Sequence, residues 1–154
     1  MTFGSESSTS GHLMPRHFLT VAGIDPDEDF QSLPNFSGSH DLTWQLVQSG
    51  SFDVGALNED VWDRAVQNGR IDGSKVRVFY TTPDYFDYNW TVRPELDGVY
   101  GEGVADRLSR ALLALNPQDH GEILELFSTQ GFIPSNNANY GDIEAVARGL
   151  GIVR

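Results

Sequence analysis

The sequence contains no cysteine, which excludes disulfides and metal sites built on thiolates. It has no apolar run near the ~20 residues that a membrane-spanning helix needs, and no signal peptide is visible at its start. Positive charge is scarce, because 10 Lys+Arg stand against 22 Asp+Glu and give a formal net charge of -12. Nucleic acid and anionic membrane surfaces both attract clustered cations, so we expect neither as a partner.

What is present is an alternation of short strand and helix patterns along 154 residues, the length of one ordinary domain. Apolar residues at helical spacing predict helices over about 11–22, 39–50, 58–69, 103–115, 118–127 and 140–150. Strands are predicted over 31–36, 52–57, 75–80 and 90–92. Such alternation predicts an α/β fold with a mostly parallel sheet flanked by helices.

A run of hydroxyl-bearing residues, Ser7–Ser10, leads into the first predicted helix. Ser and Thr at a helix start accept hydrogen bonds from free backbone N–H groups, and the same groups can instead donate to an oxyanion. The helix N-terminus adds about half a positive charge. Taken alone, Ser8 and Ser10 are more often helix caps than ligands, so both interpretations stay open at this point.

Polar residues mark two further junctions between a predicted strand and a predicted helix, at His40-Asp41 and at Asn58-Glu59. If the strands are parallel neighbours, their carboxyl ends meet at one sheet edge and the three junctions converge there. His40 could then donate to an anion oxygen. The carboxylate of Glu59 or the amide of Asn58 could receive a proton from a protonated oxyanion or an amine. Each of these side chains also fits an ordinary capping or surface role.

Catalytic and metal chemistry have weaker support. Ser8, His40 and Asp41 could serve as nucleophile, base and orienting acid, but no Gly-x-Ser-x-Gly elbow is present and adjacent His40 and Asp41 are poorly placed for orientation. The four histidines show no HExxH spacing, and no phosphate-binding or dinucleotide glycine loop occurs. We therefore predict no enzyme activity, no cofactor and no metal site, with a Ser/His hydrolase as a less favoured alternative.

Several segments together resemble one protein family in their order and spacing. They are 7–15, 38–41, 53–58 with 61–62, 75–79 with 82–83, 85–90, Arg93 and 131–134. The pattern, over nearly the whole chain, is similar to the substrate-binding proteins of phosphate/phosphite/phosphonate-type ABC transporters, particularly their selenate-binding branch. The resemblance implies one lobe of a type II periplasmic-binding-protein fold, an ABC permease as partner and a periplasmic location. It implies a small tetrahedral oxyanion as ligand, such as phosphonate, phosphite, phosphate or selenate.

The resemblance also assigns the ligand-binding residues and the domains. The family's Ser-Thr-Ser run, ligand histidine and acidic residues correspond to Ser8, Thr9, Ser10, His40, Glu59 and Asp87. Residues 1–89 correspond to a ligand-binding lobe with its crossover segments, and 90–154 to a C-terminal strand and helices. Family members carry a signal peptide and a first lobe ahead of this pattern, so we expect this chain to lack that lobe.

A lobe without its counterpart is expected to bind its anion weakly and to expose an apolar face, which favours association of two copies. The function predicted from the sequence is therefore a truncated solute-binding component of an ABC importer. The alternative is a sensory or interaction module derived from such a lobe.

Overall fold

The computed structural model describes residues 1–86 and 88–153. The chain divides into two compact units. The first unit comprises residues 1–86 and 140–154, and the second unit comprises residues 87–139. The last predicted helix thus belongs with the first unit, although the expected domain boundary lies between residues 89 and 90.

A short parallel ladder lies at the centre of the first unit. Strand β1 (Thr2–Phe3) pairs in parallel with β2 (Asn35–Phe36), and a parallel bridge joins Thr2 to Gly55. Backbone hydrogen bonds with residues 54 and 56 support that bridge. The predicted strands at 31–36 and 52–57 therefore contribute to a parallel arrangement, which confirms the α/β class. The start of the chain provides the middle segment, which the sequence patterns did not predict.

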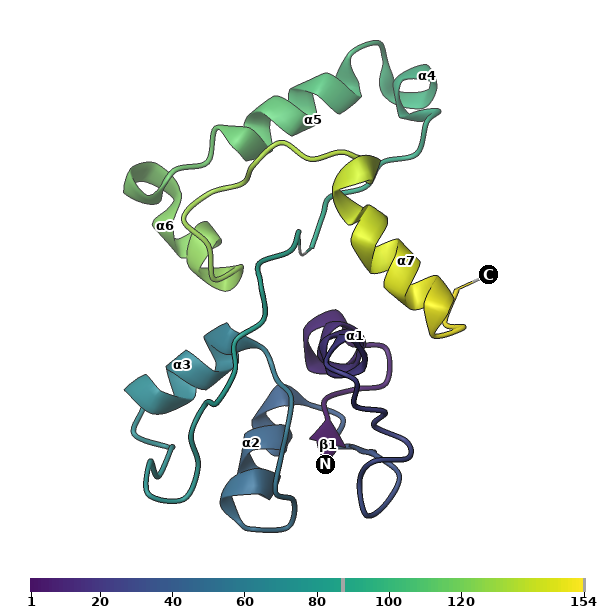
Figure 1. Cartoon of the computed structure of the whole chain (residues 1–154). Helices are drawn as coiled ribbons and strands as arrows, with labels where there is room; N and C mark the ends of the chain where they lie inside the picture. The colour runs from purple at the N-terminus through teal and green to yellow at the C-terminus, as the bar shows by residue number, and fades with distance from the viewer. Residues whose placement is uncertain (87, 154) are drawn as a thin grey trace. The chain divides into compact units, whose positions relative to one another are not determined.

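Helices of the first unit lie beside this ladder or pack on one another (Figure 1). They are the π-helix η1 (Thr9–Leu13), which continues into α1 (Met14–Val21), then α2 (His40–Gln48), α3 (Glu59–Gln67) and α7 (Gly141–Gly149). The 3-10 helix η2 (Asn137–Tyr140) precedes α7. The predicted starts are confirmed because Ser8, Ser39 and Asn58 each accept a hydrogen bond from a backbone N–H at the helix start.

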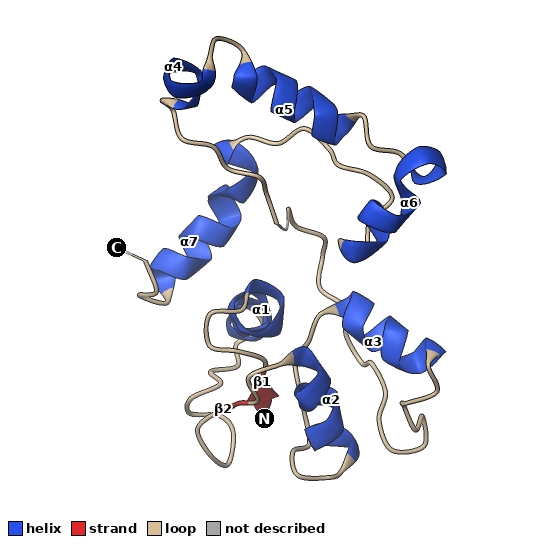
Figure 2. Cartoon of the chain, turned by 180° about the vertical axis from the view of Figure 1, so that it is seen from behind, coloured by secondary structure: helices blue, strands red, loops and turns tan. Residues whose placement is uncertain are grey.

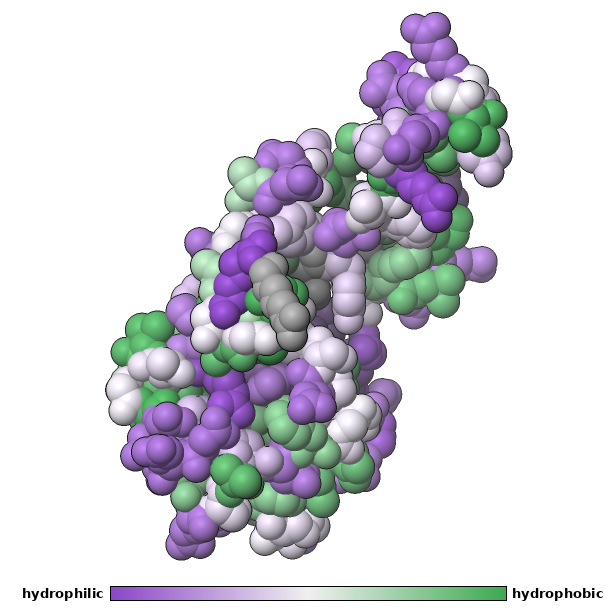
Figure 3. All heavy atoms as spheres, turned by 90° about the vertical axis from the view of Figure 1, so that its right-hand side faces the viewer, coloured by the Kyte–Doolittle hydropathy of each residue, from purple (hydrophilic) through white to green (hydrophobic). Residues whose placement is uncertain are grey.

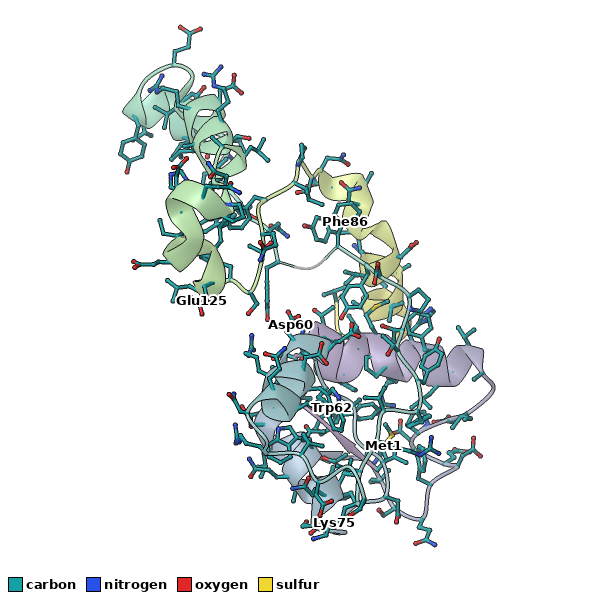
Figure 4. All side chains as sticks on the ribbon, turned by 90° about the vertical axis from the view of Figure 1, so that its left-hand side faces the viewer. Met1, Asp60, Trp62, Lys75, Phe86 and Glu125 are labelled. Carbon is teal, nitrogen blue, oxygen red and sulfur yellow. The ribbon has the colours of Figure 1, made fainter. Side chains whose placement is uncertain are left out.

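The side chains of Phe3, Leu13, Met14, Trp44, Ala65 and Ala147 form the apolar core of the first unit. Phe3 is completely buried, with 0% of its surface exposed. Gly55 has no room for a side chain, since a Cβ there would lie 2.7 Å from Thr43 Cγ2 on α2. Close packing of the third parallel segment against α2 therefore requires glycine at this position. At the other end of the unit, Phe86 lies beside the start of α7 (Figure 4).

The described residues of the second unit form helices and connecting loops (Figure 2). It contains α4 (Leu96–Tyr100), α5 (Val104–Leu113) and α6 (Pro117–Leu126). The Asp97 carboxylate accepts hydrogen bonds from the N–H groups of Gly103 and Ala105, both at 2.9 Å, and so holds the start of α5. These two backbone donors hold the pKa of Asp97 below its usual value.

The predicted strands at 75–80 and 90–92 are wrong. Among the described residues, neither segment pairs with a neighbouring strand. The Val76/Val78 alternation is typical of a strand, but a strand also needs a partner for its ladder. Large apolar side chains in these segments are consequently exposed, among them Val78, Phe79, Tyr80, Trp90 and Val92.

Hydrophobic residues reach the molecular surface in patches between hydrophilic ones (Figure 3). In the part of the chain that the structure describes, none of the helices has the length and apolar character needed to cross a membrane. The helices instead have one apolar side, in keeping with packing against a small core.

Candidate functional site

The Ser8–Gly11 segment, here called the serine loop, follows β1 and begins η1. Ser8 caps this helix, and its Oγ accepts a hydrogen bond from the Gly11 N–H at 2.9 Å. Thr9 and Ser10 occupy the first turn, which contains no acidic residue. All three hydroxyl-bearing residues are partly exposed. The loop therefore presents hydroxyls and a helix start without a carboxylate of its own to repel an anion.

His40, the first residue of α2, lies against this loop. A Cβ added at Gly11 would lie 2.9 Å from His40 Cε1 and 3.0 Å from Ser8 Oγ. A Cβ added at Gly4 would lie 3.6 Å from His40 Nδ1. The imidazole thus packs on bare backbone, and glycine at position 11 is what lets the histidine approach the serine loop so closely.

The proton of His40 can be assigned from one hydrogen bond. The backbone N–H of Asn58 donates to His40 Nδ1 at 3.2 Å, so Nδ1 is an acceptor. A neutral imidazole with an accepting Nδ1 has its proton on Nε2. In this tautomer, Nε2 is the ring atom that can donate to a ligand oxygen.

The structure therefore brings three strand-to-helix junctions together. The serine loop follows β1, His40 follows β2, and Asn58 follows the bridged segment around Gly55. The first helical residue after Asn58 is Glu59, which is exposed, as is its neighbour Asp60. The remaining residue that the resemblance assigned to the site, Asp87, lies outside the described residues. The ligand-binding roles of all six residues stay predictions.

One neighbour of the site was missed from the sequence, Gly11. Asn58 was expected at the third junction, but the hydrogen bond from its backbone N–H to His40 was not. The signal for Gly11 is its place between Ser10 and His12 at the start of a helix, where glycine costs stability unless close packing requires it.

The hydrolase arrangement of Ser8, His40 and Asp41 does not have the geometry of a catalytic triad. Asp41 Oδ1 accepts from Trp44 Nε1 at 3.3 Å and from Arg70 at 3.1 Å, so this carboxylate is engaged on α2 and with Arg70. His40 Nδ1, the atom that an orienting carboxylate would hold, accepts from a backbone N–H instead. Within residues 1–86 and 88–153, no group of three or more His, Asp or Glu could hold a metal ion.

The fold and these junctions are those of an α/β lobe with an anion-compatible sheet edge, and comparison with known proteins identifies the family. A family model for the periplasmic substrate-binding proteins of phosphonate ABC transporters matches residues 1–140. The chain belongs to this family, as the resemblance implied.

A curated relative is the "Probable ABC transporter phosphite binding protein PhnD1" of Prochlorococcus marinus (strain MIT 9301), 41% identical over 155 residues. The match covers 99% of this chain and 52% of that protein. The solved structure of PhnD1 from Prochlorococcus marinus (MIT 9301) in complex with methylphosphonate is also similar, with a TM-score of 0.86 and 40% identity. It is matched over 99% of this chain and 57% of its own.

The chain thus spans about half the length of the relatives it matches. These relatives are named for phosphite and methylphosphonate. Assignment of the chain to the selenate-binding branch stays a prediction.

Proposed function

We propose that this chain is a solute-binding component of an ABC importer and holds a small tetrahedral oxyanion of the phosphonate or phosphite type. The serine loop and His40 form the proposed binding site. The observation that carries the proposal is the close packing of His40 on the serine loop. The packing is so close that a Cβ added at Gly11 would lie only 2.9 Å from His40 Cε1. Membership in a phosphonate-binding family and the methylphosphonate complex of a relative support the same ligand class.

The chemistry of the site suits a tetrahedral anion. Backbone N–H groups at the start of η1 point along the helix axis, where the helix dipole favours negative charge. Ser8 Oγ accepts from Gly11 and can still donate its own proton, as can the hydroxyls of Thr9 and Ser10. The overall charge of -12 does not oppose this, because distant exposed charges are screened by salt while N–H dipoles act at contact distance.

The choice among oxyanions depends on which groups of the site donate a proton to the ligand and which accept one from it. His40 supplies a donor at Nε2, and the carboxylates proposed at Glu59 and Asp87 would accept a proton or an amino group of the ligand. A site with both kinds of group favours a protonated anion or an aminated phosphonate over the fully ionised sulfate or selenate. We therefore rank phosphonate and phosphite above selenate.

The proposed partner is the membrane permease of the same transporter, and the proposed location is the periplasm, where members of this family act. Association of two copies stays a prediction. Light scattering of the purified chain tests it, and a monomer at all concentrations would contradict it.

Calorimetry with methylphosphonate tests the proposed function. The variant Ser10→Ala removes a hydroxyl without touching the cap that Ser8 provides, and Ser49→Ala is a matched control at the end of α2. We expect binding to weaken by about tenfold in Ser10→Ala, the equivalent of one hydrogen bond to a charged group, and to stay unchanged in Ser49→Ala. Absence of any heat with methylphosphonate, phosphite and phosphate would contradict the proposal.

A further inference from the structure

A second histidine, His12, lies buried behind the serine loop. Only 6% of its surface is exposed. The rings of Phe3 and Phe36 each have their centroids 4.8 Å from the imidazole centroid. His12 is therefore a polar group inside an aromatic pocket made by β1 and β2, and both of its nitrogens need partners.

Both nitrogens of His12 have partners of opposite kinds. The ring Nδ1 lies 2.7 Å from the carbonyl oxygen of Glu6, which can only accept, so Nδ1 carries a proton and donates. The Nε–H of Arg16 donates to His12 Nε2 at 2.9 Å, so Nε2 is an acceptor. These partners assign the neutral imidazole with its proton on Nδ1, the opposite tautomer to that of His40.

Arg16 extends this chain of hydrogen bonds to the acidic loop that follows α1, residues 25–29. Its guanidinium forms a two-pronged ion pair with Asp27, at 2.8 and 3.2 Å. The guanidinium carbon also lies 5.3 Å from the centroid of the Phe3 ring. The Arg16 side chain is only 13% exposed and that of Asp27 is 50% exposed, so the guanidinium is the better-shielded partner of this two-pronged pair.

The carbonyl at the other end of this network belongs to Glu6, two positions before Ser8 in the printed sequence. Between them the backbone turns, with Ser8 N–H donating to the Ser5 carbonyl at 3.0 Å. Beyond Ser8, the Gly4 N–H donates to the Gly11 carbonyl at 2.8 Å. His12 thus holds the entry to the serine loop, and Gly4, the residue after β1, holds its exit.

We propose that His12, Arg16 and Asp27 are positioning residues that hold the serine loop in its anion-binding conformation through the Glu6 carbonyl. This inference rests on the proposed function for its consequence in binding, although the positioning itself can be measured without a ligand. Arg16 keeps Nε2 of His12 an acceptor, and Asp27 keeps Arg16 aligned. Loss of either partner frees the imidazole to rotate and releases Glu6.

The network requires a neutral His12. Burial lowers the pKa of His12 below its usual value, against the opposing influence of the Glu6 carbonyl. The charged groups that act on the ring are Arg16 on α1, Glu6 in the turn and Asp27 in the acidic loop. A protonated ring would present a second N–H toward the Arg16 Nε–H, so the hydrogen bond between them would be lost.

NMR of the full chain without ligand tests the positioning. Two signals report it directly: the ring nitrogens of His12 for the tautomer, and the hydrogen exchange of the Gly11 N–H that Ser8 Oγ accepts. The variants are Arg16→Gln and Asp27→Asn, and the matched control is Arg148→Gln, whose ion pair with Glu144 is exposed. If Arg16→Gln fails to fold, Asp27→Asn alone still tests the positioning role.

We expect Gly11 exchange to become about tenfold faster in Arg16→Gln, the loss of one charged hydrogen bond, with a smaller increase in Asp27→Asn and none in Arg148→Gln. We also expect the ring nitrogen signals of His12 to change from those of a single tautomer with its proton on Nδ1 to those of a mixture of tautomers. Unchanged Gly11 exchange and unchanged ring signals in the folded variants would overturn the inference.

Methylphosphonate calorimetry on the same proteins separates this inference from the proposed function. If the unmodified chain binds, we expect weaker binding in Arg16→Gln, and equal binding in both would overturn the positioning role. If the unmodified chain does not bind, the proposed function fails, while the exchange measurement still decides whether His12 and Arg16 hold the loop.

Discussion

The first and second units differ in how they bury side chains. The first unit is built on a parallel ladder, and its large side chains Phe3 and Trp44 are only 0% and 4% exposed. Among the described residues of the second unit, Leu124 is the one large apolar side chain with almost no exposure, at 1%. Rings of Trp90, Phe127 and Phe132 contact one another at its surface.

This difference explains where the candidate site lies. Parallel segments deliver the chain to the same sheet edge, so the helices that follow them begin close together, as the Asn58 hydrogen bond to His40 demonstrates. In the second unit, no strand precedes the described helices, and the carboxylate of Asp97 caps the start of α5. A carboxylate at a helix start neutralises the dipole that an anion would need.

The largest effect is expected from Phe3→Ala in the first unit. Removing a fully buried ring between His12 and Phe36 should lower the free energy of unfolding by about 3–5 kcal/mol. Urea unfolding followed by amide NMR signals of α2 measures this. Phe79→Ala is the matched control, because Phe79 is exposed, and an equal loss in both variants would contradict a core centred on Phe3.

A smaller loss is expected from Leu124→Ala in the second unit. The truncation should cost about 2–3 kcal/mol, since a unit with little other buried surface can relax around the cavity. Amide signals of α5 should report the loss, and those of α2 should not. Leu126→Ala serves as control because that side chain is exposed. Loss of signal in α2 would show that the two units unfold together.

Gly11→Ala should affect the serine loop more than the core. The new methyl would lie 2.9 Å from His40 Cε1 and 3.0 Å from Ser8 Oγ, so we expect a cost of about 1–3 kcal/mol and weaker methylphosphonate binding. Thermal unfolding and calorimetry measure the two effects. Gly73→Ala, with open space around it, should change neither. Unaltered binding in Gly11→Ala would contradict a role in methylphosphonate binding for the contact between His40 and the serine loop.

The smallest effect is a difference in pH dependence between the units. The lowered pKa of His12 gives stability that is present above its ordinary value of 6.5 and is lost as the pH falls through the lower folded value. The lowered pKa of Asp97 in the second unit gives stability that persists until the pH falls below its ordinary value of 3.8. As the pH falls from 6.5 to 3.8, the free energy of unfolding of the first unit should decrease, and that of the second unit should not.

Amide exchange of the two units, measured at successive pH values between 6.5 and 3.8, checks this difference. His12→Gln keeps an acceptor for Arg16 without a titrating ring, so it should flatten the decline in the first unit. An equal decline in the variant would assign the pH dependence to other groups.

Helix starts could be inferred from the sequence because they depend on the type of the capping residue. The convergence of the strand-to-helix junctions could be inferred because alternating strands and helices favour a parallel sheet. Ser39 and Asn58 cap helices as their residue types predict, and parallel order follows from strand–helix alternation. The strand at 75–80 was wrong because pairing requires a distant partner, which periodicity within the segment does not reveal. β1 was missed because two residues are too few to show any periodicity.

The network behind the site was beyond sequence analysis for a related reason. His12 and Arg16 are one helical turn apart, but the partner that aligns them, Asp27, lies in a loop of several acidic residues. Selecting Asp27 from that loop requires the fold. The selection of Gly11 as a contact of His40 likewise depends on how α2 packs on the serine loop.

The central claim is that the serine loop and His40 of this chain bind a tetrahedral oxyanion. An amide NMR titration with methylphosphonate tests it most directly, because weak binding is still detected and located. The account predicts saturable shifts of the Ser8–Gly11 amides and of the His40 ring signals, with those of α5 and α6 unmoved. Saturation without any shift in the serine loop, or no shift at any concentration, would contradict it.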